Sequence, residues 1–318
     1  NLLCYADGLL VSNRTLQSKF GGTIIPHARD ENRFEPDLYS RGNRRKELGF
    51  EENDRIVLFL GTPRKHKGVL EVLNAILACK NPNYKLCLIG TPPDRDYEKH
   101  LKRLGGRSLI MLPDQPFEKL PENLIIADMV RLIQDYDNEI SKYQLPAKLI
   151  DAVAMGVPVV ATPTEPIKPL IEAGVVEPVE IEQLAGKIDR ILSEADKCLA
   201  NQRQKRAVFI DDYSYAAIGY KLKDLFVIDL NNPKQLKADA LKFTDIQKSI
   251  ASAKKSAESD IGTIDFVFFW KQNDTGIYGR RSDMLVKYLA RRPEVRNIIV
   301  FYMPISIEEI RNKAASQG

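Results

Sequence analysis

The residues with the clearest chemical potential lie in the loop 61–68, which reads Gly-Thr-Pro-Arg-Lys-His-Lys-Gly. The loop joins an apolar run to an amphipathic stretch, so it is expected to link a strand to a helix. Such a turn offers an anion the backbone N–H groups and the positive dipole end of the helix. Arg64, Lys65 and Lys67 add three cations. We therefore predict a diphosphate site; the alternative is a solvent-exposed basic loop. The Gly-Lys-Ser/Thr ending of a P-loop and the spaced glycines of a dinucleotide fingerprint are both absent.

A second chemical segment runs from residue 143 to 160. A helix is expected to begin near Pro146, since proline suits a first turn, and to end at Gly156. Lys148 and Asp151 are three residues apart and so share a helix face. Lys148, near the helix N-terminus, can bind phosphate, and Asp151 can accept hydrogen bonds from ribose hydroxyls. The alternative is a modest surface ion pair between the two.

The elements that must position these residues alternate between short apolar runs and helical patterns. The runs are rich in Val, Ile and Leu, as in parallel strands covered on both faces. The expected strands are Gly8–Ser12, Thr23–Pro26, Ile56–Gly61, Lys85–Gly90, Ser108–Leu112, Met129–Ile133 and Val157–Ala161. The expected helices are Gly68–Ala78, Asp96–Leu104, Pro146–Met155 and Ile181–Ala195. This repetition predicts an α/β fold with a Rossmann-like, doubly wound parallel sheet.

Glycine and proline follow several of these strands, as in Leu60-Gly61-Thr62-Pro63 and Ile89-Gly90-Thr91-Pro92. Ligands of open parallel sheets bind in the crevice at the carboxyl ends of the strands. These residues therefore stand where a ligand site is expected, although ordinary turn chemistry accounts for them equally well.

The stretch from Ala6 to about Phe226 resembles the C-terminal, donor-binding domain of GT-B glycosyltransferases, in the large retaining family called glycosyl transferases group 1. "FLGTPRKHKG" is similar to that family's Gly-Arg-x-x-x-x-Lys-Gly phosphate loop, and "LPAKLIDAVAMGVPVVAT" to its Glu-Ala-Met-Ala-x-Gly-x-Pro-Val-Val segment. The resemblance implies a UDP- or GDP-linked sugar as donor, with no separate cofactor and no metal. It assigns Asp151 to the catalytic site and assigns donor contacts to Gly61, Thr62, Arg64, Lys67, Gly68 and Lys148.

Two positions depart from the family pattern. The family often has two glutamates separated by seven residues; Asp151 matches the second, whereas Tyr143 stands at the first. The acid that contacts the donor sugar in the family is therefore missing, and Tyr143 takes its place in the expected donor site. Thr62 stands where the family has arginine, with Arg64 two residues later.

The nucleotide base is expected beyond the second and third strands of the expected sheet. In the family this region forms the base pocket, which points here to Gly90, Leu112 and Pro113. Phe117 can pack on a base, although a buried aromatic residue is more often part of a core.

His27 lies in the polar segment that follows the strand Thr23–Pro26. A histidine at the expected domain cleft can act as acid, base or donor contact, so we include it among the catalytic candidates. A hydrogen-bonded structural histidine is the alternative.

A fresh strand–helix–strand pattern begins near residue 262, with the strand Ile264–Trp270, the helix Tyr278–Arg291 and the strand Arg296–Pro304. "FVFFWKQNDTGIYGRRSDMLVKYLA" resembles the beginning of a GT-B N-terminal, acceptor-binding domain. One βαβ unit cannot bury a core alone, so we expect it to dock on its own chain or to form a homodimer.

The predicted organisation is a donor domain at 1–228, a linker or surface helix at 229–261 and an incomplete acceptor domain at 262–318. A donor domain that precedes an acceptor domain predicts a fragment of a longer tandem enzyme.

Composition excludes several classes of protein. The 318 residues are 44% hydrophobic and 28% charged, with a net charge of +4. No run reaches the roughly 18 apolar residues of a membrane span.

Basic residues are not interleaved with aromatic ones, so nucleic acid is not an expected partner. The tightest basic cluster, Arg44-Arg45-Lys46, is expected to be a solvated helix face; contact with an anionic membrane or lipid-linked acceptor is the alternative.

The four cysteines include no CxxC pair, so no zinc site is expected. Free thiols are typical of a reducing compartment, which predicts a cytoplasmic protein, at most peripheral to the inner face of a membrane.

The most consistent function is transfer of a sugar from a nucleotide diphosphate donor to a glycan or lipid-linked acceptor. Cations around Lys67 would stabilise the leaving diphosphate as negative charge develops on it. Two alternatives stay open. One is a degenerate, non-catalytic module for scaffolding or glycan binding, because of Tyr143. The other is a sugar-phosphate or nucleotide epimerase, because some share the GT-B fold.

Overall fold

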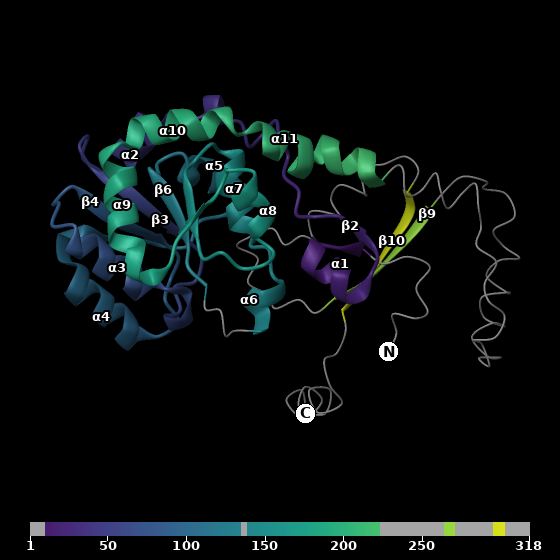
Figure 1. Cartoon of the computed structure of the whole chain (residues 1–318), viewed down its shortest axis with the longest axis horizontal. Helices are drawn as coiled ribbons and strands as arrows, with labels where there is room; N and C mark the ends of the chain where they lie inside the picture. The colour runs from purple at the N-terminus through teal and green to yellow at the C-terminus, as the bar shows by residue number, and fades with distance from the viewer. Residues whose placement is uncertain (1–9, 135–138, 223–263, 271–294, 303–318) are drawn as a thin grey trace, which may run out of the picture. The chain divides into compact units, whose positions relative to one another are not determined.

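The computed structural model describes residues 10–134, 139–222, 264–270 and 295–302. The chain divides into two units, residues 1–225 and 226–318. The first unit holds a six-stranded, all-parallel sheet in the order β5-β4-β3-β6-β7-β8. Its strands are β3 (Arg55–Leu60), β4 (Tyr84–Ile89), β5 (Leu109–Leu112), β6 (Met129–Leu132), β7 (Val159–Ala161) and β8 (Glu177–Pro178). Strands β3, β4 and β6 of this sheet are labelled in Figure 1. The predicted Rossmann-like parallel sheet is confirmed; β8 was not expected.

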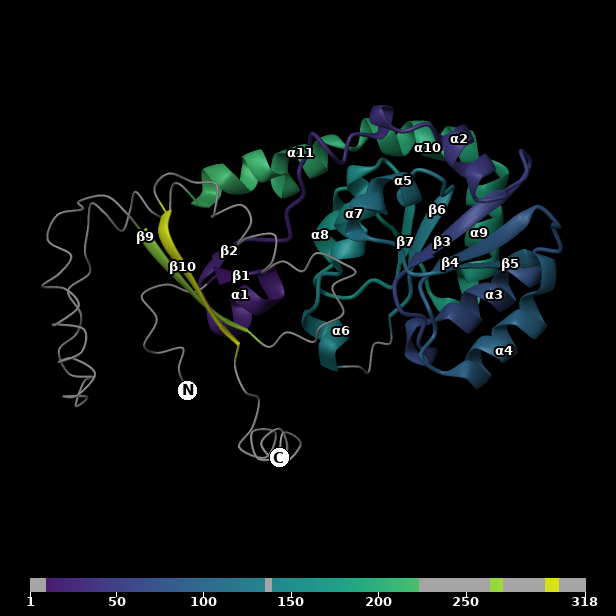
Figure 2. The same cartoon turned by 180° about the vertical axis from the view of Figure 1, so that it is seen from behind.

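Helices cover both faces of the sheet (Figure 2). Successive strand residues point to opposite faces, and Val57 and Phe59 of β3 face the core that contains α3 and α9. The helices on this face are α3 (Val69–Ala78), α4 (Arg95–Gly105) and α9 (Leu184–Ser193). Those on the other face include α2 (Arg41–Glu47), α5 (Leu120–Leu124) and α7 (Ala147–Ala154). Because both faces are covered, the central strands are apolar almost throughout, as their sequences indicated.

The first unit also contains further helices and 3₁₀ turns. They are α1 (Arg14–Phe20), α6 (Glu139–Tyr143), α8 (Lys168–Glu172), α10 (Ala195–Gln204), α11 (Ala207–Tyr213) and the 3₁₀ turns η2 (Pro36–Leu38), η3 (Lys65–Lys67), η4 (Gly106–Ser108), η5 (Phe117–Lys119) and η6 (Ile181–Gln183). The expected strands at 8–12 and 23–26 appear as β1 (Leu10–Val11) and β2 (Thr23–Ile24). These two strands pair in parallel as a separate sheet and do not extend the main one.

The basic cluster at 44–46 corrects the expectation of a solvated helix face. Arg45 is 8% exposed. Its guanidinium donates to the Ile126 carbonyl and pairs with Asp128 at 2.7 Å. Arg44 bonds Asn123, so Lys46 alone of the three is fully available to solvent or to an anionic surface. These arginines tie α2 to the loop before β6, which is why α2 forms although its sequence has little apolar periodicity.

In the second unit, β9 (Ile264–Trp270) and β10 (Val295–Tyr302) pair in parallel, from Val295 opposite Ile264 to Tyr302 opposite Trp270. Both strands were expected. The helix expected between them and the linker at 229–261 lie outside the described residues, and the proposed homodimer stays a prediction. Within the described residues, no helix combines the length and apolarity needed to cross a bilayer.

Gly90 is required where β3 and β4 end. It has a φ of 138°, and a Cβ there would lie 2.3 Å from the Gly61 carbonyl oxygen. We expect Gly90→Ala to lower the free energy of unfolding by about 2–4 kcal/mol. The alanine would have to adopt an unfavourable positive φ, and its Cβ would clash with the Gly61 carbonyl. Gly186, in the first turn of α9, has no atom within 4 Å of the position that a Cβ would take. Gly186→Ala should instead raise stability by about 0.5–1 kcal/mol. Urea unfolding of both variants checks the pair, and equal effects would contradict the steric account.

Candidate functional site

The loop after β3 forms an open helix N-terminus at the carboxyl edge of the sheet. The Gly61 N–H donates to the Ile89 carbonyl at 2.8 Å, and the Lys67 ammonium donates to the Thr62 carbonyl at 3.1 Å. Gly68 takes the left-handed conformation, with a φ of 60°, and caps α3 without a side-chain hydrogen bond. The first N–H groups of α3 therefore have no side-chain cap, which is the arrangement that binds anions.

The N-terminus of α7 meets the same edge. Its N-cap, Pro146, provides no side-chain hydrogen bond, and its first turn carries no acid. The Lys148 ammonium donates to the Leu60 carbonyl, which ties α7 to the end of β3. The neighbouring strands β3 and β6 lead to helices on opposite faces. Such a switch point is where ligands of open α/β sheets bind. Lys67 lies close enough to Lys148 there to lower its pKa, and binding of a diphosphate by the two lysines stays a prediction.

The charges at this edge are predominantly positive. Burial and the neighbouring Lys67 lower the pKa of Lys148 to about 7, and Arg131 contributes in the same direction. The pKa of Lys67 is also lowered, by burial first and then by Arg64 and Arg131. Cations that depress each other's pKa gain from a bound anion, because it restores the charged form of each. The edge is therefore suited to a multiply charged anion such as a diphosphate.

Arg131, in the middle of β6, is a residue that the sequence interpretation missed. It is 1% exposed and donates to the Lys67 carbonyl. Its guanidinium lies 4.7 Å from the centre of the Phe59 ring, and burial lowers its pKa to about 9. An arginine inside an apolar run was the signal available in the sequence, because arginine is rarely buried without a partner.

Asp151 does not form the surface ion pair with Lys148 that was offered as an alternative. Its carboxylate pairs with Arg29, with Nε and Oδ1 2.6 Å apart and both side chains at most 4% exposed. Burial raises the pKa of Asp151, and Arg29 opposes this effect. Arg29 also bridges the Phe34 and Phe117 rings. Asp151 thus joins α7 to the segment after β2, and its contact with a ribose stays a prediction.

Tyr143 and His27 are the two remaining candidates for contact with the donor sugar or for catalysis. Tyr143 ends α6, and the Lys19 ammonium lies 4.1 Å from the centre of its ring. Its carbonyl accepts a hydrogen bond from Asn13 at 2.9 Å. His27 is half-buried, two residues before Arg29. Roles in catalysis for His27 and in sugar contact for Tyr143 stay predictions.

The residues expected at the base lie at the ends of β4 and β5. The Gly90 N–H donates to the Leu112 carbonyl at 3.1 Å, which extends the sheet ladder, and Pro113 is exposed just beyond. Phe117 is 7% exposed and lies between Arg29 and Arg33, so it packs as a core residue. Contact of Gly90, Leu112 and Pro113 with a base stays a prediction, whereas the buried Phe117 exposes little of its ring to a ligand.

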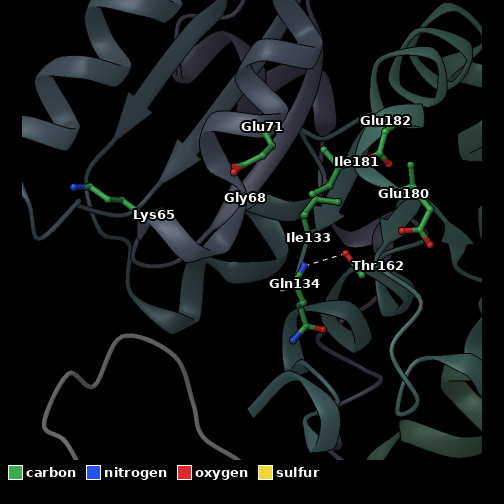
Figure 3. A pocket seen from close by; sticks show the side chains of 10 residues that line it. Lys65, Gly68, Glu71, Ile133, Gln134, Thr162, Glu180, Ile181 and Glu182 are labelled. Carbon is green, nitrogen blue, oxygen red and sulfur yellow. Dashed lines mark hydrogen bonds between the residues drawn. The ribbon is translucent and has the colours of Figure 1, made fainter. Parts of the chain in front are cut away.

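A hollow of about 360 Å³ opens beside Gly68 on the α3 side of the sheet (Figure 3). Three carboxylates line it, Glu71 from α3 and Glu180 and Glu182 from around η6, together with one cation, Lys65. Gln134 and Thr162 also line it, and the Gln134 backbone N–H donates a hydrogen bond to the Thr162 hydroxyl at 3.0 Å. Acceptor oxygens suit hydroxyl donors better than a second anion. In the described part of the chain, no group of three or more His, Cys, Asp and Glu side chains could hold a metal ion.

The lowered pKa of Lys148 predicts how stability depends on pH without ligand. Its folded-state pKa is about 7, against about 10.4 in the unfolded chain. Between these values the unfolded state binds the extra proton, so stability rises with pH. From pH 7 to 9 we expect the free energy of unfolding to rise by about 2 kcal/mol relative to Lys148→Met, which lacks this group. Urea unfolding of both proteins at both pH values measures it. Parallel pH profiles would show that Lys148 is not perturbed.

Comparison with known protein families assigns the chain to one of them. Residues 40–208 match the model of the family Glycosyl transferases group 1, which is more than half of the chain. The chain belongs to that family, as the two motifs indicated. No curated protein matches it significantly.

Solved structures of glycosyltransferases share the fold at low sequence identity. HepE from Anabaena, in complex with UDP and glucose, is 19% identical with a TM-score of 0.60; the match covers 71% of this chain and 64% of HepE. Sucrose-phosphate synthase from Thermosynechococcus elongatus is 21% identical with a TM-score of 0.58, covering 70% and 58%. A glycosyltransferase from Rickettsia africae is 16% identical with a TM-score of 0.60, covering 73% and 67%. The chain thus spans less than two thirds of HepE and of the synthase.

Proposed function

We propose that this chain binds a UDP- or GDP-linked sugar through its first unit and serves as the donor-binding part of a hexosyltransferase. The sugar would pass to a glycan or lipid-linked acceptor with retention of anomeric configuration. Family membership supports glycosyl transfer, and the ligands of HepE, UDP and glucose, are of the proposed donor class. Retention and the acceptor class rest on the family resemblance alone.

The observation that carries the proposal is the positive edge at the β3–β6 switch point. Lys67 comes from the turn before α3 and Lys148 from the first turn of α7, and the two lie close together near the uncapped N-terminus of α3. A leaving diphosphate gains negative charge as the bond to the sugar breaks. Preplaced cations and N–H groups stabilise that charge more than they stabilise the intact donor, which is how they would accelerate transfer.

We also propose that the chain belongs to a longer, tandem enzyme. The parallel pairing of β9 and β10 supports this proposal, because a parallel pair is what the resemblance to the start of an acceptor-binding domain leads us to expect. Comparison of the activity of the longer protein with that of this chain addresses the proposal.

The second candidate function is a degenerate module that binds nucleotide or glycan without turnover. The observation in its favour is Tyr143, which stands where the family has a carboxylate. Its ring makes a cation–π contact with the Lys19 ammonium. Binding of a nucleotide sugar without transfer or hydrolysis in the longer protein would favour this candidate over a working transferase.

Calorimetric titration with UDP and GDP tests donor binding. We expect one of them to bind the chain, and uridine and guanosine to bind much more weakly, because the diphosphate supplies most of the contacts. Lys67→Ala should weaken diphosphate binding about tenfold, as expected for one charge-assisted hydrogen bond. Equal affinities for nucleoside and nucleoside diphosphate would contradict the proposed site.

A further inference from the structure

Arg131 differs from the other deeply buried arginines of the first unit in its lack of a carboxylate partner. Arg29 pairs with Asp151, and Arg45 pairs with Asp128. Arg131 is equally buried, yet among the described residues it forms no ion pair, and its Nε and Nη2 have no hydrogen-bond partner. A buried guanidinium with unused donors is costly, so its presence in β6 needs an explanation.

The surroundings of Arg131 connect it to the phosphate loop. Its Nη1 donates to the Lys67 carbonyl, immediately before the turn at Gly68. The same nitrogen lies 3.5 Å from the position that a Cβ on Gly68 would take. Arg131 therefore lies directly beneath the turn that opens α3, on the protein side of the expected anion.

The acidic groups near Arg131 only partly offset its charge. Glu71 is its negative neighbour, whereas the nearby Tyr97 hydroxyl is neutral near pH 7, because burial and Glu71 raise its pKa. A Glu71 carboxylate oxygen and the Tyr97 hydroxyl are themselves buried without hydrogen-bond partners among the described residues. On the side of the loop, Arg131 faces Lys67 and Lys148, which are both cations. The unliganded edge thus holds more positive charge than its own carboxylates balance.

We propose that Arg131 is a positioning residue for diphosphate binding, which holds the Lys67–Gly68 turn from below and supplies buried positive charge behind it. This inference rests on the proposed function. Binding of a diphosphate on the outer side of the turn offsets the burial of this charge, and the fixed Lys67 carbonyl keeps the adjacent N–H groups of α3 directed at the anion. Arg131 touches the loop and not the donor, so it acts through Lys67 and Gly68.

The test uses Arg131→Met and Arg131→Lys in the full chain, with inorganic pyrophosphate and UDP as probes. Arg131→Met should weaken binding of both probes about ten- to hundredfold, the effect of losing one charged interaction. Arg131→Lys should recover part of that loss, because it keeps the charge. Arg131→Met should nevertheless match or exceed the wild type in urea unfolding, because an apolar side chain replaces a buried charge that has no counter-ion.

Arg41→Met is the matched control. Arg41 is half-buried, with 26% of its side chain exposed, and pairs with Asp128 at 2.5 Å, but it lies on α2, away from the loop. This variant should lose stability and keep its pyrophosphate affinity, which is the reverse pattern. A purely structural role for Arg131 predicts that both variants behave like Arg41→Met, and that result would overturn the inference.

Amide hydrogen exchange in residues 62–68 provides a readout without ligand. We expect Arg131→Met to raise exchange there and Arg41→Met to leave it unchanged. If wild type binds neither pyrophosphate nor any nucleotide, the proposed function fails, and the exchange result alone decides whether Arg131 holds the turn. If wild type binds but Arg131→Met binds equally well, the proposed function stands and the role of Arg131 is refuted.

Discussion

Replacement of Asp151 by alanine is expected to lower the free energy of unfolding by about 3–5 kcal/mol, the usual cost of removing one partner from a buried ion pair. The Arg29 guanidinium would keep its charge in a site where its side chain is 2% exposed. The pair also links α7 to the segment after β2, so its loss should loosen the support of Lys148 three residues earlier. Urea unfolding followed by circular dichroism measures the change.

A surface ion pair supplies the control for Asp151→Ala. Asp37 pairs with Arg203 at 2.9 Å, with both side chains largely exposed, so Asp37→Ala should change stability by about 1 kcal/mol or less. The double variant Arg29→Met/Asp151→Leu should be more stable than Asp151→Ala, because no charge is left unpaired. A loss near that of Asp37→Ala would show that the Arg29–Asp151 pair is not a structural link.

Replacement of Lys148 by methionine is expected to weaken diphosphate binding about ten- to hundredfold, because a charge-assisted contact is lost. In the wild type, the unliganded pKa of about 7 means that binding must protonate Lys148 at higher pH. Affinity should therefore fall by up to about tenfold per pH unit between pH 7 and 9. Lys148→Met should lose this dependence.

Lys85→Met is the control for Lys148. Lys85 is a half-buried lysine at the opposite, amino end of the strands, where it faces Asp54 at 3.6 Å. Its replacement should leave both the diphosphate affinity and its pH profile unchanged. Calorimetry with UDP or GDP at pH 7, 8 and 9 compares the three proteins. A similar pH slope in Lys148→Met and wild type would assign the proton to another group.

Local sequence patterns predicted the parts of the site that neighbouring residues determine. The loop 61–68 and the start of α7 follow from apolar runs, glycine, proline and helix periodicity, each acting within a few residues. The parallel order of the strands follows from the same alternation, because βαβ connections leave few arrangements.

Contacts between distant segments could not be predicted in this way. The Arg29–Asp151 pair joins segments that are far apart in the sequence, so Asp151 was interpreted from its helix neighbour Lys148 instead. Arg45 was taken for a solvated residue because its carboxylate partner, Asp128, lies far along the sequence in the loop before β6. In each case a buried partner determines whether a charged residue is a surface group, a structural link or a ligand contact.

The most direct test of the account is a crystal structure of the chain grown with UDP or GDP. We predict that the diphosphate lies over the N-terminus of α3, within hydrogen-bonding distance of the Lys67 and Lys148 ammonium groups, with the base towards Gly90 and Pro113. A nucleotide found only elsewhere, for example in the hollow bordered by Glu180 and Glu182, or no bound nucleotide at saturating concentration, would contradict a donor site at the β3–β6 switch point.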